Sequence, residues 1–512
     1  MVKDDLQKIL GDVKLEHPNL ESFGDYSFRG KLSIVNSPLS IIDKVAEVNG
    51  FVNIRLKTDY LVAQLPKLAQ LDELPQLGQG KTVIVEYSSP NIAKHFGIGH
   101  FRSTVIGQVI YNLYRELGYR VIGHNHLGDW GTQFGKLLFM IDRYKEIDYD
   151  IDRLEKWYVE FHELAKNDSE LEAEARKWFK RLEDEEPVVR KIWEKCVSAS
   201  MREFSKVYKL LAVNIDNAWG ESFYEKLMPE IIADAKAKGV ATESEGALII
   251  DTGHESPLML LKSDGGTTYA TRDLATILYR MRQFDPHKII YEVGVEQTLY
   301  FKQLFEAAKR LGYLKNDVEL IHVSHGLYLA PDGKKFSTRG GNTARLEDIL
   351  KEAIHRAKDS VEVGVGALKY FDLLHSLQGN IVFDWEKLMA LQGNSGPYLQ
   401  YTYARIMSVR AKGQGLSAKD LAPSTQHLAL NAEELSILRW IYRFPEVVIE
   451  ATGRHSPNLL CNFLYELAQR FNTFYNKRPI LKNEFRLLLT QSVGEVLKKG
   501  LDILGIATPE KM

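Results

Sequence analysis

Hydrophobic and polar positions follow a strand-and-turn pattern at the start of the chain. Residues 1–80 alternate short apolar runs, such as KLSIV and GFVNIRL, with polar turns. From residue 81 the pattern changes to an apolar strand, TVIVEY, then a helical pattern over about residues 100–117 and a second strand, RVIGHN. Strand, helix and strand in that order predict a βαβ unit of a parallel sheet. We therefore predict a small α+β module that leads into an α/β domain.

Two further changes of pattern divide the rest of the chain. Residues 142–212 are dense in charge and helix formers, which predicts a helical insertion reaching to about residue 245. The α/β pattern returns over residues 246–325, with the strands GALIID, KIIYEVG and ELIHVSH separated by helical segments. From about residue 393 the pattern is helical throughout, and one face carries the apolar residues Leu459, Leu460, Phe463, Leu464, Leu467, Ala468 and Phe471.

These patterns predict an α/β fold with three domains. We expect an α+β domain at residues 1–80 and a Rossmann-type domain at 81–392, interrupted by the helical insertion at about 142–245. An all-α domain should follow at 393–512. A length of 512 residues agrees with several hydrophobic cores rather than one.

Composition narrows the class of protein. The two cysteines, Cys196 and Cys461, are far apart and belong to no C-x-x-C motif, which argues against a disulfide framework or a thiolate metal site. We find neither a signal-peptide pattern nor an apolar run of the ~18 residues that a membrane span needs, so we expect a cytoplasmic protein. The net charge of -2 argues against a global positive field for nucleic acid. Basic patches at 176–182 and 469–482 fit either RNA binding or solvated helix faces.

The segment SSPNIAKHFGIGHFRST, residues 88–104, follows the strand that ends near Glu86. Ligands of doubly wound sheets bind at the carboxyl ends of the strands. Gly97 and Gly99 permit close approach of a backbone to a ligand, and the following helix start offers free N–H groups to phosphate. The motif G-x-G-H alone also fits a tight turn before a helix.

Two other segments carry candidate chemistry. In GKKFSTRGGN, residues 333–342, cationic side chains alternate with hydroxyls and glycines, which suits a polyphosphate and also a solvated basic turn. In TTYATRD, Tyr269 and Asp273 are four residues apart on a predicted helix and share a face.

The motifs together resemble one family. VIVEYSSPNIAKHFGIGHFRST, NHLGDWGTQFGKLL, TTYATRDL, YEVGVEQ, KKFSTRGG, GNSGPYLQYTYARIMS and GLDILGIATPEKM occur in the order found in arginyl-tRNA synthetases, class I aminoacyl-tRNA synthetases. The resemblance implies a class I Rossmann-type catalytic domain, an added N-terminal domain and an α-helical anticodon-binding domain. It implies ligation of L-arginine to arginine tRNA through an arginyl-adenylate, with ATP as substrate, Mg²⁺ bound with ATP, no dedicated protein metal site, tRNA-dependent adenylate formation and a monomer.

The resemblance also implies roles for residues that bind ATP. His100, Lys94, Lys335 and Ser337 would be catalytic, and Gly97, Gly99, His100, Lys334, Lys335 and Phe336 would bind ATP. Two positions depart from the family motifs: Gly97 stands where a histidine is usual, and Thr338 stands where a second lysine is usual. Similar enzymes that lack this second lysine have one where Lys94 stands. These departures leave open a catalytically inactive, synthetase-like tRNA-binding protein, while a small-molecule nucleotidylyltransferase would not need the helical C-terminal domain.

The remaining implied residues contact arginine and tRNA. The arginine-binding set is Glu86, Ser89, Asn91, Tyr269, Asp273 and Gln297, with Asp129, Trp130 and Gln133 as the pocket wall. Carboxylates are the expected partners of a guanidinium, which is a planar fork of donors. The tRNA-binding set is Phe51, Asn53, Tyr398, Tyr401 and Tyr475. Phe51 fits a core position equally well, and the tyrosines of PYLQYTYAR fit domain packing equally well.

Overall fold

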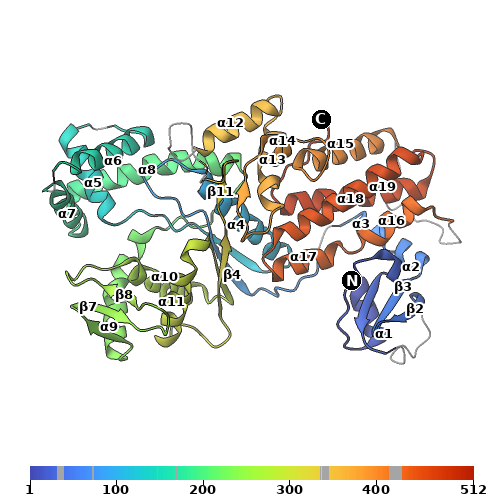
Figure 1. Cartoon of the computed structure of the whole chain (residues 1–512), viewed down its shortest axis with the longest axis horizontal. Coiled ribbons are helices and arrows are strands. Elements are labelled where there is room, and N and C mark those ends of the chain that lie inside the picture. The colour runs from blue at the N-terminus through green and yellow to red at the C-terminus, as the bar shows by residue number, and fades with distance from the viewer. Residues whose placement is uncertain are drawn as a thin grey trace. The chain divides into compact units, whose positions relative to one another are not determined.

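A computed structural model describes residues 1–31, 40–71, 74–146, 148–168, 170–334, 336, 345–413 and 429–512 (Figure 1). The chain divides into two compact units. The sheet unit comprises residues 78–356 and 375–384, and the helical unit comprises residues 1–77, 357–374 and 385–512.

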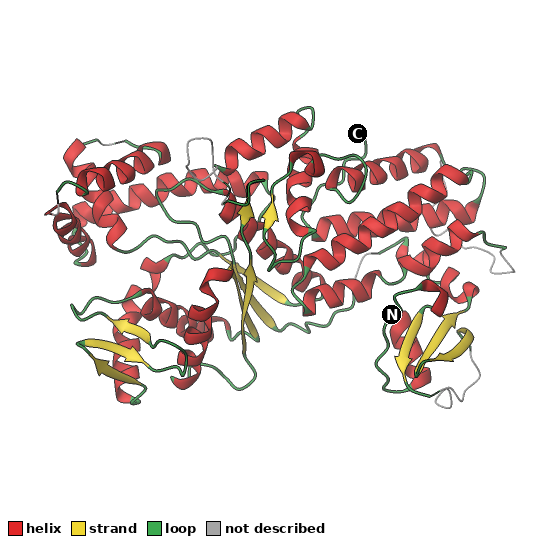
Figure 2. Ribbon diagram, viewed as in Figure 1, coloured by secondary structure: helices red, strands yellow, loops and turns green. Residues whose placement is uncertain are grey.

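A four-stranded parallel sheet forms the centre of the sheet unit (Figure 2). Its strands are β4 (Thr82–Glu86), β5 (Arg120–His124), β9 (Lys288–Gly294) and β10 (Glu319–His325), in the order β10-β9-β4-β5. All five residues of β4 are buried, as expected for the central strand of a covered parallel sheet. α4 (Ile98–Glu116) connects β4 to β5 at one edge of the sheet, and α11 (Thr298–Arg310) connects β9 to β10 at the opposite edge. The strand order therefore reverses between β4 and β9, where an open α/β sheet binds its ligands.

The predicted insertion at about residues 142–245 contains the helices α6 (Ile151–Ala165), α7 (Glu170–Glu183) and α8 (Pro187–Leu210), and α5 (Thr132–Tyr144) is the helix expected after Trp130. Pro187 occupies the first position of α8, where a missing N–H costs nothing. A short helix η3 (Glu221–Leu227) and α9 (Met228–Ala237) follow α8 in the chain.

The expected strand GALIID does not join the parallel sheet. β7 (Ala247–Ile250) lies between β6 (Ala241–Ser244) and β8 (Leu258–Leu261) in a separate antiparallel sheet. Our assignment of this strand to the second half of the Rossmann-type sheet was wrong, because strand periodicity does not reveal the pairing partner. The second half of the parallel sheet begins only at β9.

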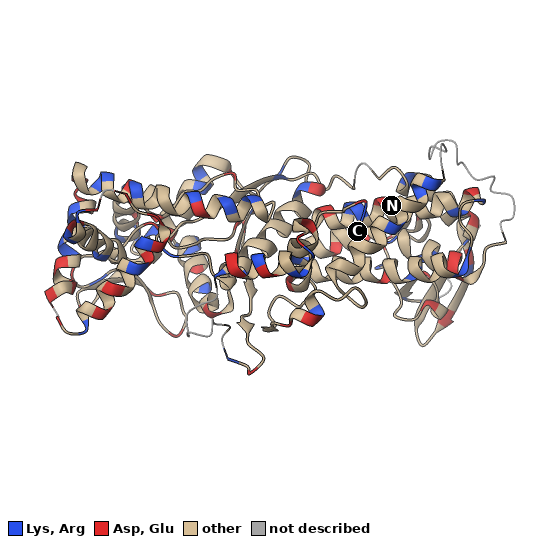
Figure 3. Ribbon diagram, turned by 90° about the horizontal axis from the view of Figure 1, so that it is seen from above, with Lys and Arg blue, Asp and Glu red and all other residues tan. Residues whose placement is uncertain are grey.

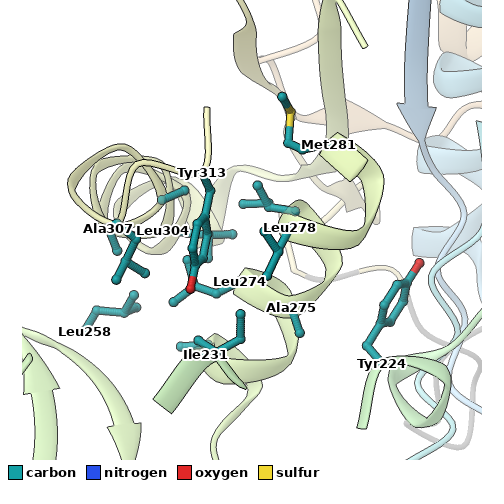
Figure 4. Close-up of a cluster of buried hydrophobic side chains, with 14 of the residues drawn as sticks. Tyr224, Ile231, Leu258, Leu274, Ala275, Leu278, Met281, Leu304, Ala307 and Tyr313 are labelled. Atoms are coloured by element: carbon teal, nitrogen blue, oxygen red, sulfur yellow. The ribbon is translucent and has the colours of Figure 1, made fainter. Parts of the chain in front are cut away.

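A hydrophobic cluster holds α10 (Tyr269–Phe284) in place (Figure 4). Leu274 and Leu278 of α10 pack with Ile231 of α9, Leu258 of β8 and Leu304 of α11. Because α10 is fixed on several sides, polar side chains on its remaining face have defined positions.

Four further described elements of the sheet unit come after β9 or β10 in the chain. They are β11 (Tyr328–Leu329), which pairs in parallel with β12 (Ile381–Val382), the turn η4 (Val295–Gln297) and α12 (Leu346–Arg356).

The helical unit contains a small antiparallel sheet and a set of packed helices. The sheet has the order β1-β3-β2, from β1 (Tyr26–Arg29), β2 (Ile42–Val48) and β3 (Phe51–Leu56), with α1 (Val2–Leu10), η1 (Glu21–Phe23), α2 (Thr58–Val62) and α3 (Leu65–Leu68) around it. The helices are α13 (Val361–Leu373), α14 (Trp385–Leu388), α15 (Gly396–Lys412), α16 (Ala432–Ile441), α17 (Phe444–Gly453), α18 (Pro457–Lys477) and α19 (Glu484–Ile503). Of the predicted apolar face of α18, Leu459 is half-buried and the other six residues are buried: Leu460, Phe463, Leu464, Leu467, Ala468 and Phe471.

Lysine and arginine residues are interspersed with aspartate and glutamate residues along the ribbon (Figure 3). Among the described helices, we find none with the length and apolar character needed to cross a membrane.

Candidate functional site

The loop after β4 has an unusual backbone. Ser88, Ser89 and Ala93 have φ values of 76°, 44° and 64°, in the left-handed region that residues other than glycine rarely adopt. Their backbone N–H groups donate to Ser103 Oγ at 3.1 Å, Asn125 Oδ1 at 3.0 Å and Ser200 Oγ at 2.9 Å. Strain of this kind persists only where the surroundings hold it, and it gathers at functional sites. The insertion helix α8, which carries Ser200, thus helps to fix this loop at the switch point.

The N-terminus of α4 follows, with His100 in its first turn. The Gly97 N–H donates to His100 Nδ1 at 3.3 Å, so a neutral ring carries its proton on Nε2. Burial, and then the charge of Lys94, lower the pKa of His100 to about 4. A Cβ added at Gly99 would meet no described atom within 4 Å, so packing of the chain does not demand this glycine. The helix start therefore presents a neutral N–H donor and open backbone, which suits phosphate.

Arg345, which sequence reasoning missed, braces the same helix start. Its backbone pairs with Gly97 in an isolated antiparallel bridge, and Leu346 N–H donates to Phe96 O at 2.8 Å. The Arg345 guanidinium donates to Asp152 at 2.8 Å and Glu155 at 3.2 Å, both on α6. Its hydrogen bond lowers the pKa of the Asp152 carboxyl. No local signal marks a residue that acts by pairing with a segment so distant in sequence.

The second predicted phosphate segment is described only in part. Lys334 is exposed, and its backbone N–H donates to Asp332 Oδ1 at 3.0 Å. The Phe336 ring lies 4.9 Å from that of Phe383. Lys335, Ser337, Thr338 and Arg339 lie outside the described residues.

Glu86 ends β4 and is paired within the protein. Arg280 of α10 donates to Glu86 Oε2, and both side chains are buried. Sequence reasoning missed Arg280, although a signal was present: it stands seven residues after Asp273, which is two turns along the same helix face. The two carboxylates predicted for the pocket, Glu86 and Asp273, are therefore accompanied by a cation, the Arg280 guanidinium.

Asp273 lies in a group of aromatic and cationic side chains. Tyr300 donates to Asp273 Oδ2, and His126 Nε2 lies 3.7 Å from Oδ1. Burial raises the pKa of the Asp273 carboxyl. The exposed Tyr269 ring lies 4.8 Å from that of Tyr300.

A cleft of about 760 Å³ opens beside these residues, lined in part by Tyr269, Tyr300 and Arg272. Arg272 pairs with Glu221 at 2.8 Å. Gln297 is exposed at the end of η4, and Asn91 pairs with Gly128 through a backbone bridge. The Ser89 hydroxyl is buried without a hydrogen-bond partner among the described residues. A buried hydroxyl normally has such a partner, so this one suits contact with a polar ligand.

Asp129 makes hydrogen bonds within the protein, and Trp130 packs against another aromatic ring. Asp129 accepts from Ser222 N–H at 2.9 Å and Ser222 Oγ at 2.7 Å, and Trp130 is buried against Trp193. Gln133 Nε2 lies 3.5 Å from Gly128 O. Asp129 and Trp130 thus hold the fold around the site.

One cluster has metal-ligand chemistry. Glu86, His124 and His126 offer atoms that lie within 4.8 Å of one another. Glu86 is already paired with Arg280, and a divalent ion there would lie close to that guanidinium. Like-charge repulsion opposes a resident metal at this position.

In the helical unit, two of the three predicted tRNA-binding tyrosines lie beside an arginine side chain. The Arg405 guanidinium lies over the rings of Tyr401, at 4.9 Å, and Tyr475, at 4.8 Å. Tyr398 OH accepts from Asn472 at 3.0 Å. Tyr401 and Tyr475 are exposed, so this group forms an aromatic and basic surface of the kind that stacks on bases. Sequence reasoning did not identify Arg405.

The two predicted residues of the N-terminal domain differ in exposure. Phe51 is 44% exposed, whereas Asn53 is 6% exposed. Both residues belong to β3, the central strand of the three-stranded sheet, but Phe51 is the first residue of the strand, whereas Asn53 lies within it. Phe51 is therefore a surface residue, and the Asn53 amide is not presented to solvent.

Comparisons with known proteins agree with this architecture. Residues 64–362 match the model of the class I (R) tRNA synthetase catalytic domain, and residues 399–512 match the DALR anticodon-binding domain. The fold is similar to those of the arginyl-tRNA synthetases of Plasmodium falciparum, with a TM-score of 0.84 at 25% identity, and of Thermus thermophilus, with a TM-score of 0.84 at 22% identity. These similarities cover 100% of this chain and 97% and 100% of the two structures.

Curated relatives are similar over nearly the whole chain. An arginine–tRNA ligase of Chloroflexus aurantiacus is 38% identical, covering 94% of this chain and 89% of the relative. Arginine–tRNA ligase 1 of Bacillus cereus is 37% identical, covering 99% and 96%. With the switch-point site, the class I catalytic domain and the helical anticodon-type domain in one polypeptide, the chain belongs to the arginyl-tRNA synthetase family.

Proposed function

We propose that the chain ligates L-arginine to arginine tRNA through an enzyme-bound arginyl-adenylate, with the site residues placed as follows. The main support is that two groups adjoin the carboxyl end of β4. One is the N-terminus of α4, which carries His100, and the other is the pocket with Glu86 and Asp273. One group suits phosphates and the other suits a guanidinium. Adenylate formation needs both substrates at one place.

In the first step, an arginine carboxylate oxygen attacks the α-phosphorus of ATP and the bond to pyrophosphate breaks. No protein nucleophile is required, so the protein contributes orientation and stabilisation of phosphate charge. His100 Nε2–H is the proposed neutral donor, and Lys94 supplies positive charge close to it. Lys334, Lys335, Phe336 and Ser337 are proposed to complete the ATP site, with Mg²⁺ bound by the ATP phosphates.

The arginine side chain is proposed to enter beside α10. Its guanidinium pairs with the Asp273 and Glu86 carboxylates, and Tyr269 and Gln297 line the approach. Ser89 and Asn91 take the α-amino and carboxylate end, where the Ser89 hydroxyl lacks a described partner. In the second step, a hydroxyl of the terminal tRNA ribose attacks the adenylate carbonyl and AMP leaves.

Contact with tRNA is proposed for two surfaces. The Tyr401–Arg405–Tyr475 group offers stacking and positive charge, and Tyr398 adjoins it through Asn472. The exposed Phe51 offers a further stacking surface. We propose that the enzyme acts as a monomer in the cytoplasm.

Charging of total tRNA with ATP, Mg²⁺ and each labelled amino acid in turn tests the function. We expect arginine alone to become acid-precipitable on tRNA. No charging, together with retained tRNA binding in a mobility-shift assay, would contradict the proposal and would indicate an inactive tRNA-binding protein.

A further inference from the structure

The ammonium group of Lys94 lies on an aromatic ring of the helical insertion. Its Nζ is placed over the ring of Tyr158 of α6, 4.8 Å from the ring centre, and both side chains are half-buried. Among the described residues, no ion pair or hydrogen bond of Lys94 Nζ accompanies this contact. A ring contacts an ammonium group from one side, so the N–H donors on the other side stay available to phosphate oxygens.

The backbone around Lys94 is held, but the side chain is not held by it. The Ala93 N–H donates to Ser200 Oγ at 2.9 Å, and the Phe96 ring packs edge-on against that of Phe204, with ring centres 5.8 Å apart. A lysine side chain on a fixed backbone still rotates about its flexible four-carbon stem. The place of Nζ therefore depends on what the ammonium group itself contacts.

The Tyr158 ring has a defined place of its own. The His162 ring packs edge-on against it, with ring centres 4.7 Å apart. Burial, and then the charge of Lys136, lower the pKa of His162, so this ring is neutral at neutral pH and does not repel the Lys94 ammonium. Three other side chains of α6 are buried and anchor the helix: Leu154, Trp157 and Phe161.

α6 is tied to the start of α4 by a second set of contacts. Asp152, in the first turn of α6, lies 2.9 Å from His95 Nε2 and accepts from the Arg345 guanidinium at 2.8 Å. The Arg345 backbone in turn pairs with Gly97, which precedes α4. Because these contacts do not involve Tyr158, the place of the helix does not depend on that ring.

We propose that Tyr158 is a positioning residue of the ATP site, which holds the Lys94 ammonium group close to His100 through a cation–π contact, ready for the charge that develops on the ATP phosphates. The inference rests on the proposed function of Lys94 in adenylate formation. A charge that is in place before the reaction stabilises the transition state without reorganisation. A lysine without the ring must instead be ordered at each turnover.

The test measures kcat and KM in ATP–pyrophosphate exchange with arginine and tRNA present, because this reaction reports adenylate formation. Tyr158→Leu keeps an apolar side chain and removes the ring. A cation–π contact of this kind corresponds to about 2- to 30-fold. We expect kcat to fall by about 3- to 30-fold, with KM for arginine within about twofold of wild type. Tyr158→Phe keeps the ring, so its kcat should stay within about twofold of wild type.

A double variant shows whether Tyr158 acts through Lys94. Lys94→Met alone should lower kcat by ~100- to 1000-fold, because it removes a donor to a developing charge. Adding Tyr158→Leu to Lys94→Met should cause no further loss, because the ring then has no cation to hold. Tyr144→Leu is the matched control: Tyr144 is an exposed tyrosine of the insertion whose ring stacks on Trp157 of α6. It should leave the exchange reaction unchanged.

Four outcomes would overturn the inference. They are an unchanged kcat in Tyr158→Leu, an equal loss in Tyr158→Phe, an equal loss in Tyr144→Leu, or a further loss when Tyr158→Leu is added to Lys94→Met. The midpoint of thermal unfolding and the affinity for tRNA report whether each variant is folded. If Tyr158→Leu is not, Tyr158→Met takes its place with the same expectations.

Lys94→Met separates the two levels of the argument. An unchanged kcat in this variant would refute the proposed function of Lys94 itself. A loss in Lys94→Met without a loss in Tyr158→Leu would refute only the role of Tyr158 and leave the proposed function standing.

Discussion

His100 at the start of α4 offers a direct test of how the site stabilises phosphate. Replacing it with alanine removes the Nε2–H donor, while the Gly97 N–H loses only its acceptor Nδ1. Loss of one donor to a developing charge typically costs ~100- to 1000-fold in rate, equivalent to about 2.7–4 kcal/mol. We expect His100→Ala to lower kcat for tRNA charging by this amount.

Gly97→His is the informative comparison, because it supplies the histidine usual in the family motif. Gly97 has φ -92° and ψ 167°, an extended conformation that other residues adopt, and the new residue keeps the backbone N–H that sets the His100 tautomer. We therefore expect a smaller change in kcat than His100→Ala produces. Equal losses would refute the assigned roles.

The protonation state of His100 makes the same reasoning testable by pH. Since its pKa is lowered to about 4, the ring is neutral from pH 6 to 8, and kcat should show no acid limb from this group there. The unfolded-state pKa is about 6.5, so the unfolded chain binds more protons between pH 6.5 and 4. The group's stabilisation is present above pH 6.5 and is lost, by at most about 3.4 kcal/mol, as pH falls through 4. A kcat limb near pH 6.5 that His100→Gln abolishes would show that the charged ring does the work.

Four further substitutions have defined outcomes. Asp273→Asn should raise KM for arginine roughly 10- to 150-fold, the loss of a hydrogen bond to a charged group of about 1.5–3 kcal/mol, measured by steady-state charging. Tyr475→Ala should weaken tRNA binding by about 1–3 kcal/mol with an unchanged salt slope, whereas Arg405→Ala should also reduce the slope by about one, as checked by binding at several salt concentrations. Burial lowers the pKa of Lys369 to about 7, so stability should rise with pH between about 7 and 10.4, by at most about 1.4 kcal/mol per unit. Lys369→Met should abolish that rise in denaturant melts at each pH.

Local sequence determined the elements that bear the site. The apolar run of β4, the glycines before α4 and the spacing of Tyr269 and Asp273 on α10 all depend on neighbours within a few residues. Periodicity and turn chemistry act over that range, so these elements were predictable. The motif order likewise identified the family, which the whole-chain similarity confirms.

Tertiary structure decided what depends on pairing between distant segments. β7 joins β6 and β8 rather than the parallel sheet, and Asn53 is buried although Phe51 on the same strand is exposed. Arg280 meets Glu86 across 194 residues of sequence, and Arg345 reaches Asp152 across 193. A side chain's charge state and partners depend on burial and on what the fold brings within a few ångströms, and hydrophobic periodicity carries neither quantity.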